Sequence, residues 1–391
     1  MPLGYLLQKV HDWVMRNKRA AFFFTLSVIG FITAWYFNGI AVMKGQDYLS
    51  AWFATEVDWV LSLDLLIVAV AGVGFMIYEA KRLGIRRVWL YILLSGITAM
   101  AATFPFFLAM RELRLRSIEL AGGKIDKYEF DGHRVDVWVP PNLDESTPVL
   151  VMHDGKNVFY PKFSTYGATW GLLEAMRPDH IGFTRIHAER KPLIIAVWGL
   201  GDGTRMMELG PEDIYSAHPE IIANLPDFLQ PADPTPRSNA YQALLATKIL
   251  PSIAAKYGVK LDPSRTAIGG SSMGGLASIY GMCKYPETYG TALSFSTHWP
   301  FGYETTIEKL TAMMPSPGLH RIWTDTGTLE LDAEYPPFHA KAVSRLEELG
   351  YRFHHDLMHG VYANTGHNEN WWASRVEHPI NWWLSGLPSK P

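Results

Sequence analysis

The sequence predicts an α/β domain built on a mainly parallel sheet, preceded by an all-α membrane region of three transmembrane helices. The first 110 residues are dominated by long apolar runs, whereas short apolar strands alternate with helices from about residue 127 onward. At 391 residues the chain also has room for more than one domain. We therefore expect a membrane region over residues 1–116, a linker over 117–127, and an α/β domain over 128–391.

Three apolar runs, each about 20 residues or longer, make up most of the membrane region. They cover residues 21–43, 59–78 and 88–110. A helix of about 20 apolar residues crosses a hydrocarbon core of about 30 Å. Aromatic residues near the ends of the runs, such as Trp35, Trp59 and Trp89, are typical of a membrane interface. Buried helices of a soluble bundle are the alternative, but those would show polar faces that these runs lack. We expect Pro105 to kink the third helix.

The basic residues predict the orientation of these helices. They precede the first run and lie between the second and third, whereas the loop between the first two runs is more acidic than basic. The positive-inside rule therefore places the N-terminus in the cytoplasm. Three crossings then carry the chain after Met110 to the outer side, although Arg111, Arg114 and Arg116 favour the opposite side. We expect a multi-pass protein of the cytoplasmic (inner) membrane whose α/β domain faces the extracytoplasmic, periplasmic side.

Composition and motifs argue against several kinds of partner. The formal net charge of -3 argues against nucleic acid. Cys283 is the only cysteine, so the chain has no internal disulfide. Its sequence holds no phosphate-loop or dinucleotide fingerprint, and its histidines form no convincing metal-ligand set. We therefore expect no cofactor and no metal, and we expect the partners to be the membrane and a small-molecule, lipid or glycan ester.

Apolar strands separated by helices characterise the second half of the chain. The expected strands cover residues 134–139, 148–153, 192–198, 266–270, 291–295, 321–325 and 352–358, and helices are expected over 240–257, 276–283 and 339–349. This alternation predicts a mainly parallel sheet covered on both faces. Ligands of such sheets bind outside the carboxyl ends of the strands. We expect residues 211–237, rich in Pro, Asp and Asn, to form a long loop or cap near the site.

The segment Gly270-Ser271-Ser272-Met273-Gly274 fits the pattern G-x-S-x-G of a nucleophile elbow. An expected strand precedes it and an expected helix follows it, which is the context the motif requires. A strained turn of this kind exposes a serine hydroxyl above the end of a strand. A Gly/Ser-rich loop without chemistry is the alternative. The strand and helix on either side favour Ser272 as a nucleophile.

A serine hydroxyl is a poor nucleophile at neutral pH and needs a histidine base, which a carboxylate must orient. The expected base is His367, which follows a strand and a glycine-containing loop near the C-terminus, and His359 is its first rival. The acid is expected after the sixth strand, where Glu330, Asp332 and Glu334 are available. We favour Asp332, with Glu330 second.

An oxyanion hole requires backbone N–H groups that point at the developing negative charge. The residue after the nucleophile, Met273, supplies one such donor. The second is expected from the loop over residues 153–157, where Lys156 is the candidate and Gly155 lets the backbone approach. Asp154 is expected to brace that loop rather than to act in the chemistry.

Four blocks of the sequence resemble the putative-esterase group of α/β-hydrolases. They are Met152–Phe159, Gly269–Gly275, Gly327–Ala333 and Gly366–Glu369. The group includes esterase D-like enzymes, enterochelin esterases, feruloyl esterases and the mycobacterial mycolyltransferases. The resemblance covers about residues 135–383. It implies an α/β-hydrolase fold, with Ser272 as nucleophile, His367 as base and an acid within residues 330–332. A three-helix membrane region is not a usual feature of the group.

Two further residues lie in blocks similar to those of the group, and we expect them to bind substrate. Arg205 is suited to a carboxylate or carbonyl, and a structural salt bridge to the region of Glu212 or Asp213 is the alternative. Trp170 is the second. Residues and resemblance together predict a membrane-anchored serine esterase that acts through an acyl-enzyme. An envelope acyltransferase with the same acyl-serine is one alternative, and a non-catalytic membrane scaffold or sensor is the other.

Overall fold

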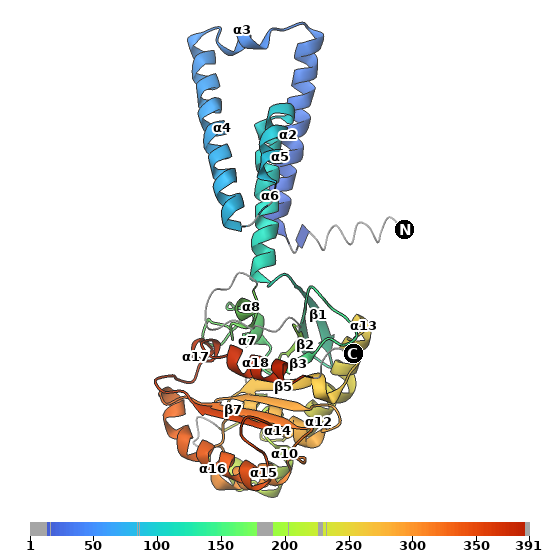
Figure 1. The fold of residues 1–391 in the computed structure, drawn as a ribbon, viewed down its shortest axis with the longest axis vertical. Helices are drawn as coiled ribbons and strands as arrows, with labels where there is room; N and C mark the ends of the chain where they lie inside the picture. The colour runs from blue at the N-terminus through green and yellow to red at the C-terminus, as the bar shows by residue number, and fades with distance from the viewer. Residues whose placement is uncertain are drawn as a thin grey trace. The chain divides into compact units, whose positions relative to one another are not determined.

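The computed structural model describes residues 14–387 except 16, 84, 86, 178–190, 202, 226–229 and 232. The chain divides into two compact units, Met1–Glu119 and Leu120–Pro391. The first is helical, and the second is a sheet with helices on both faces (Figure 1). Helix α6 (Met100–Glu119) continues into the stretch 117–127 that we expected to be a linker, and strand β1 (Lys124–Phe130) starts within it. Only a short turn therefore separates regular structure in the two units.

Two long helices of the N-terminal unit are apolar enough to cross a membrane. These helices, α2 (Lys18–Met43) and α4 (Glu56–Leu83), meet the criteria of length and composition for a membrane span. A short helix, α3 (Tyr48–Trp52), lies between them in the sequence. Many large apolar side chains of both long helices are exposed, including Ile32 and Ile67. The first two expected spans thus correspond to α2 and α4.

The third expected span, residues 88–110, is instead two helices, so that prediction was wrong. Helix α5 (Val88–Thr98) ends at Ala99, which has φ 102° and ψ 146°, and α6 starts at the next residue. Pro105 lies inside α6, so the break precedes the proline rather than occurring at it. The ring of Tyr91 in α5 contacts the rings of both Phe106 and Phe107 in α6. The two helices therefore form a hairpin. Hydropathy is insensitive to such a reversal because both arms are apolar.

The C-terminal unit contains an eight-stranded sheet in the order β1-β2-β4-β3-β5-β6-β7-β8. Besides β1, its strands are β2 (His133–Val139), β3 (Val149–Met152), β4 (Leu193–Val197), β5 (Thr266–Ser271), β6 (Thr291–Phe295), β7 (Arg321–Thr326) and β8 (Leu357–Val361). Strand β2 runs antiparallel to β1 and β4, and all other neighbours are parallel. This is the strand order of the α/β-hydrolase fold, and the prediction of a mainly parallel sheet is confirmed.

Helices connect these strands. They are α7 (Lys156–Phe159), α8 (Leu172–Ala175), α9 (Arg205–Leu209), α10 (Glu212–Ala217), α11 (Glu220–Ala223), α12 (Ser238–Ala243), the π-helix η2 (Leu244–Ile249), α13 (Leu250–Tyr257), α14 (Met273–Lys284), α15 (Tyr303–Ala312), α16 (Tyr335–Glu348), α17 (Glu369–Ala373) and α18 (Glu377–Ser385), with short 3₁₀ turns η3 (Pro263–Arg265) and η4 (Glu330–Glu334).

The expected long loop over 211–237 contains α10 and α11, and its residues 226–229 and 232 lie outside the described residues. The last expected strand starts at Leu357, because residues 352–356 form a turn in which Asp356 accepts from the N–H of Arg352.

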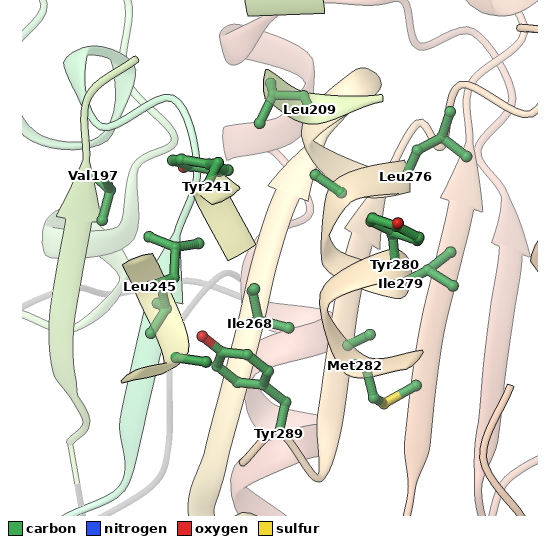
Figure 2. Close-up of a cluster of buried hydrophobic side chains, with 14 of the residues drawn as sticks. Val197, Leu209, Tyr241, Leu245, Ile268, Leu276, Ile279, Tyr280, Met282 and Tyr289 are labelled. Carbon is green, nitrogen blue, oxygen red and sulfur yellow. The ribbon is translucent and has the colours of Figure 1, made fainter. Parts of the chain in front are cut away.

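Each face of the sheet carries its own apolar core. Helices α12 to α16 cover one face, where Leu276, Ile279 and Tyr280 of α14 pack beside Ile268 of β5 (Figure 2). Helices α7, α8, α17 and α18 cover the other face, with Trp383 among the buried side chains. Full burial of one such large apolar side chain stabilises the fold by about 1.5–3 kcal/mol. These two cores fix the positions of the loops at the carboxyl ends of the strands.

Candidate active site

Ser272 occupies a strained turn between a buried strand and a helix. Strand β5 ends at Ser271 and α14 begins at Met273, and Ser272 between them has φ 56° and ψ -123°. A non-glycine residue at positive φ costs about 1–3 kcal/mol, so the surroundings must hold it in place. The N–H of Ser272 donates to the carbonyl of Phe295 over 2.9 Å, and its own carbonyl accepts from the N–H of His298 over 3.3 Å.

Glycines allow the strand and the helix to meet at this turn. A Cβ atom on Gly270 would lie 2.7 Å from the carbonyl oxygen of Gly274, and one on Gly275 would lie 2.3 Å from Ser294 Oγ. Both distances are shorter than any tolerable contact, so neither position has room for a side chain. The first glycine of the motif and the glycine that directly follows the motif are therefore both required by the geometry.

His367 and Asp332 form a hydrogen-bonded pair. His367 follows β8, Asp332 lies in η4 after β7, and His367 Nδ1 is 2.6 Å from Asp332 Oδ1. Burial acts to raise the pKa of Asp332, but the hydrogen bond and charge of His367 outweigh it and hold that pKa below its ordinary value. At neutral pH the carboxylate is therefore ionised and can only accept, so Nδ1 carries the proton. Nε2 of His367 is left with a lone pair that can accept a proton.

A buried polar network fixes the second oxygen of Asp332. Oδ2 accepts from Ser296 Oγ over 2.5 Å and from the N–H of Gly327 over 2.8 Å. Ser296 Oγ in turn accepts from Trp372 Nε1 and from Arg375 Nη2, each over 2.9 Å. Ser296 and Arg375 were missed by our sequence reasoning, because they lie far from Asp332 along the chain and belong to no motif.

Glu330, the second candidate acid, does not bind the ring of His367. It contacts the loop that carries His367 instead. Its carboxylate accepts from the N–H of His367 over 2.8 Å and from Asn368 Nδ2 over 3.0 Å. Asp332 thus binds the ring of His367, whereas Glu330 binds the loop that carries His367. His359, the rival base, lies in β8, where its ring packs against Phe353 and His339.

Tyr335 lies between Ser272 and His367. Its hydroxyl interacts with the side chain of Ser272 and also contacts Nδ1 of His298. Its ring centroid is 5.4 Å from that of His367. Burial lowers the pKa of His298 to about 3, so this second imidazole is neutral at physiological pH. Neither Tyr335 nor His298 was singled out by the sequence, since each is placed by the fold rather than by a local pattern.

The two expected oxyanion donors begin helices beside the elbow. Met273 is the first residue of α14, and a first-turn N–H has no acceptor within its own helix. Lys156 is the first residue of α7, which follows β3. Asp154 in the same loop lies against the elbow, because a Cβ on Gly274 would be 3.3 Å from its Oδ2. A Cβ on Gly155 would be 2.6 Å from the ring of Trp198, so this loop also needs its glycine.

The contacts of Arg205 and Trp170 bear on the expectation that these residues bind substrate. Arg205 makes a bidentate salt bridge with Asp154, with Nε–Oδ1 of 2.7 Å and Nη2–Oδ2 of 2.6 Å. The salt bridge that we considered as the alternative therefore exists, but its acid is Asp154 rather than Glu212 or Asp213. Burial acts to raise the pKa of Asp154, and Arg205 holds it below its ordinary value.

Trp170 is completely buried, so a substrate cannot touch it. Its ring centroid is 4.8 Å from that of Phe295 and 5.6 Å from that of Trp372. It therefore supports the site from the core. Among the described residues, no group of three or more His, Cys, Asp or Glu is placed to hold a metal ion.

Comparison with known proteins gives two family matches and several distant relatives. Residues 220–378 match the family described as "Putative esterase", and residues 22–113 match DUF2834, a family of unknown function. The uncharacterized protein YbbA of Bacillus subtilis is 23% identical over 212 residues, which cover 53% of this chain and 73% of YbbA.

Solved structures of enterobactin-hydrolysing enzymes resemble the chain at low identity. The enterobactin esterase FES of Shigella flexneri is 17% identical with a TM-score of 0.47, covering 67% of this chain, and the chain spans 59% of the length of that structure. The enterobactin hydrolase IroE, in complex with DFP, is 17% identical with a TM-score of 0.48, covering 67% of this chain and 95% of IroE. The family match supports an enzyme that hydrolyses carboxylic esters. The C-terminal domain thus contains the match to the putative esterase family, and the helical unit before it contains the match to DUF2834.

Proposed function

We propose that this protein is a membrane-anchored serine esterase in which Ser272 is the nucleophile, His367 the general base and Asp332 the residue that orients it. One observation carries the proposal. Ser272 stands at positive φ on the elbow, Tyr335 contacts both its hydroxyl and the ring of His367, and Nδ1 of that ring is bonded to Asp332. A serine and an imidazole with a free Nε2 are the two groups that acyl transfer needs.

The reaction follows from these groups. As Oγ of Ser272 attacks the ester carbonyl, its proton passes to Nε2 of His367 and the carbonyl π electrons move to oxygen. Collapse of this tetrahedral species breaks the ester C–O bond, and the imidazolium protonates the departing alcohol. His367 next removes a proton from water, whose oxygen attacks the acyl-serine. The carboxylic acid leaves as Oγ of Ser272 regains a proton from His367.

The oxyanion hole is proposed to consist of the N–H groups of Met273 and Lys156. Both donors are the first residues of helices, and first-turn N–H groups have no acceptor within their own helix. Removal of one such donor typically costs about 10²–10³ in kcat. The salt bridge between Arg205 and Asp154 has a positioning role, because it anchors the loop that presents Lys156.

Labelling by a fluorophosphonate probe tests the proposal. The full-length protein in detergent is expected to label and to cleave short-chain p-nitrophenyl esters. Ser272→Ala should lose both properties, whereas Ser374→Ala, at an exposed serine at the end of α17, should keep both. Failure of the wild type to label and to cleave any such ester would refute the proposal that the protein is an enzyme, and would favour a membrane scaffold or sensor. Persistent labelling of Ser272→Ala would refute the choice of nucleophile.

The acyl group of the same acyl-serine can also be transferred to an alcohol, which releases Ser272 and forms a new ester. The two long apolar helices favour a membrane setting, in which a lipid or glycan hydroxyl is available as an acceptor. Addition of a simple alcohol to the ester assay measures how the acyl-enzyme divides between water and alcohol. Release of free acid as the main product supports the esterase, and efficient formation of the new ester supports the acyltransferase.

A further inference from the structure

The helical unit contains a hairpin whose first arm is too short to cross a bilayer. Helix α5 has 11 residues and is about 16 Å long, compared with a hydrocarbon core of about 30 Å. The chain then reverses at Ala99, and α6 runs back along α5. The arms of this hairpin are the apolar residues that would otherwise be a third membrane span.

Contacts with the two long helices give the depth of the hairpin tip. A Cβ on Gly30 of α2 would lie 2.2 Å from the carbonyl oxygen of Ala101, and one on Gly72 of α4 would lie 2.5 Å from Met100 Cε. Gly30 is about 18 Å along α2 from its first residue, near the middle of that helix. Gly72 is likewise well inside α4. The tip therefore lies about halfway along both long helices.

Polar groups near the tip are satisfied within the protein, as a lipid environment requires. The hydroxyl of Ser27 in α2 donates to the carbonyl of Ala102 over 2.7 Å. Ser95 Oγ and Thr103 Oγ1 hydrogen-bond each other across the hairpin over 2.5 Å. The N–H of Ala99 itself donates to the carbonyl of Ser95 over 3.2 Å. A reversal of the chain inside a bilayer is therefore compatible with this structure.

An ion-pair cluster shows that α6 returns to the end of the unit from which α2 starts. Glu79, near the end of α4, is only 3% exposed and binds Arg111 of α6 over 2.5 Å. Arg19, near the start of α2, lies 4.0 Å from Glu112 of α6. Arg114 Nε of α6 donates to the carbonyl of Leu83, the last residue of α4, over 2.9 Å. The start of α2, the end of α4 and the end of α6 thus share one end.

The distribution of charge identifies this end as the cytoplasmic one. Among the described residues, basic side chains gather toward it from the start of α2, from the end of α4 and from the second half of α6: they are Lys18, Arg19, Lys81, Arg82, Arg111, Arg114 and Arg116. The opposite end, between α2 and α4, carries Lys44 against Asp47, Glu56 and Asp58. Basic residues mark the cytoplasmic side of membrane proteins. The arginines of α6, which contradict a three-span arrangement, agree with an arrangement of two spans.

We propose that α5 and α6 form a re-entrant hairpin between two membrane spans, so that the esterase domain faces the cytoplasm. This placement rests on the proposed membrane anchoring and is the opposite of the periplasmic side that three crossings would give. It restricts the substrate class to esters that reach the cytoplasmic leaflet or dissolve in the cytosol. Esters confined to the outer envelope are excluded.

Cysteine accessibility in intact bacteria tests the placement with the full-length chain. In a Cys283→Ala background, single cysteines would replace Gln46 in the loop after α2, Glu119 at the end of α6, and Glu348 at the end of α16, all exposed positions. A membrane-impermeant maleimide should label Gln46→Cys in intact cells. Labelling of Glu119→Cys and Glu348→Cys should be absent in intact cells and appear after permeabilisation.

Each other outcome overturns the proposal in a distinct way. Labelling of all three variants in intact cells would establish three crossings. Labelling of Glu119→Cys and Glu348→Cys, with no labelling of Gln46→Cys, would show that the two spans have the opposite orientation. Recovery of the full-length chain in the soluble fraction would remove the membrane anchor. Cleavage of a p-nitrophenyl ester by each purified variant is a separate measurement, so a failed topology and a failed esterase are told apart.

Discussion

Asp332→Asn should reverse the tautomer of His367 while leaving the fold intact. Oδ2 of Asp332 accepts two hydrogen bonds, from Ser296 and Gly327, whereas Oδ1 accepts one, from His367. An asparagine keeps two of the three bonds by placing its carbonyl oxygen at Oδ2 and its NH₂ at Oδ1. That NH₂ then donates to Nδ1 of His367, which moves the ring proton to Nε2. The proton then occupies the position that must accept the proton of Ser272.

The expected magnitude follows from this geometry. A histidine in the wrong tautomer lowers kcat by about 10⁴ in the serine protease on which the triad is defined, which corresponds to about 5.5 kcal/mol of barrier. We expect Asp332→Asn to lower kcat by about 10³–10⁴ and stability by about 1 kcal/mol, because one hydrogen bond changes its sense. Glu330→Gln is the matched control. Its amide still accepts from the N–H of His367, so we expect less than about a tenfold loss.

Steady-state kinetics on a p-nitrophenyl ester, with urea unfolding of each variant, provides the assay. The reasoning fails if Asp332→Asn keeps about a tenth or more of the wild-type kcat. It also fails if Glu330→Gln is the more damaged of the two, since the acid would then be Glu330. A large loss of stability in Asp332→Asn would show that the asparagine does not adopt the expected orientation.

Three further predictions concern packing, charge and pH. Gly275→Ala should lose most of the activity and about 1–3 kcal/mol of the free energy of unfolding, measured with urea. Gly203→Ala should match the wild type in both, because an added Cβ there would have no other atom within 4 Å. Arg205→Met leaves the buried carboxylate of Asp154 unpaired and should lower the free energy of unfolding by about 3–5 kcal/mol. Unfolding of this variant at the wild-type urea concentration would show that the salt bridge is dispensable. Burial lowers the pKa of both His153 and His339 to about 4, so only the unfolded chain takes up their protons just below pH 6.5. Stability should therefore fall by about 2 kcal/mol for each histidine between pH 7 and 5, and a flat profile would contradict this.

Local patterns predicted the parts of the site that the backbone defines. The elbow is recognisable because its strand, its turn and its helix are contiguous, and because Gly270 is required by a contact with Gly274, four residues away. The choice between Glu330 and Asp332 was open for the opposite reason. Both lie on one short 3₁₀ turn, two residues apart, and only the position of the loop after β8 decides which side chain meets the ring of His367.

Contacts between distant segments were beyond sequence reasoning. Ser296 is 36 residues from Asp332, and Arg375 is 79 residues from Ser296, yet the three side chains share one hydrogen-bonded chain. The reversal at Ala99 was missed because both arms of the hairpin are apolar, so a hydropathy window detects one continuous run. Arg111, Arg114 and Arg116 were the visible signal. Three crossings leave these arginines in conflict with the positive-inside rule, and the proposed re-entrant hairpin removes that conflict.

The buried network explains why this site can hold an ionised carboxylate in the core. Asp332 and Arg375 are 0% and 1% exposed, and an isolated buried charge would be strongly destabilising. Three hydrogen-bond donors reach Asp332, and Arg375 adds an ion pair with Asp325 over 3.1 Å. Pairing of both charges offsets the cost of burying them, and the three donors leave the carboxylate of Asp332 a single orientation. The ring of His367 therefore acquires its tautomer from the core of the domain, which is the tautomer that the proposed attack by Ser272 requires.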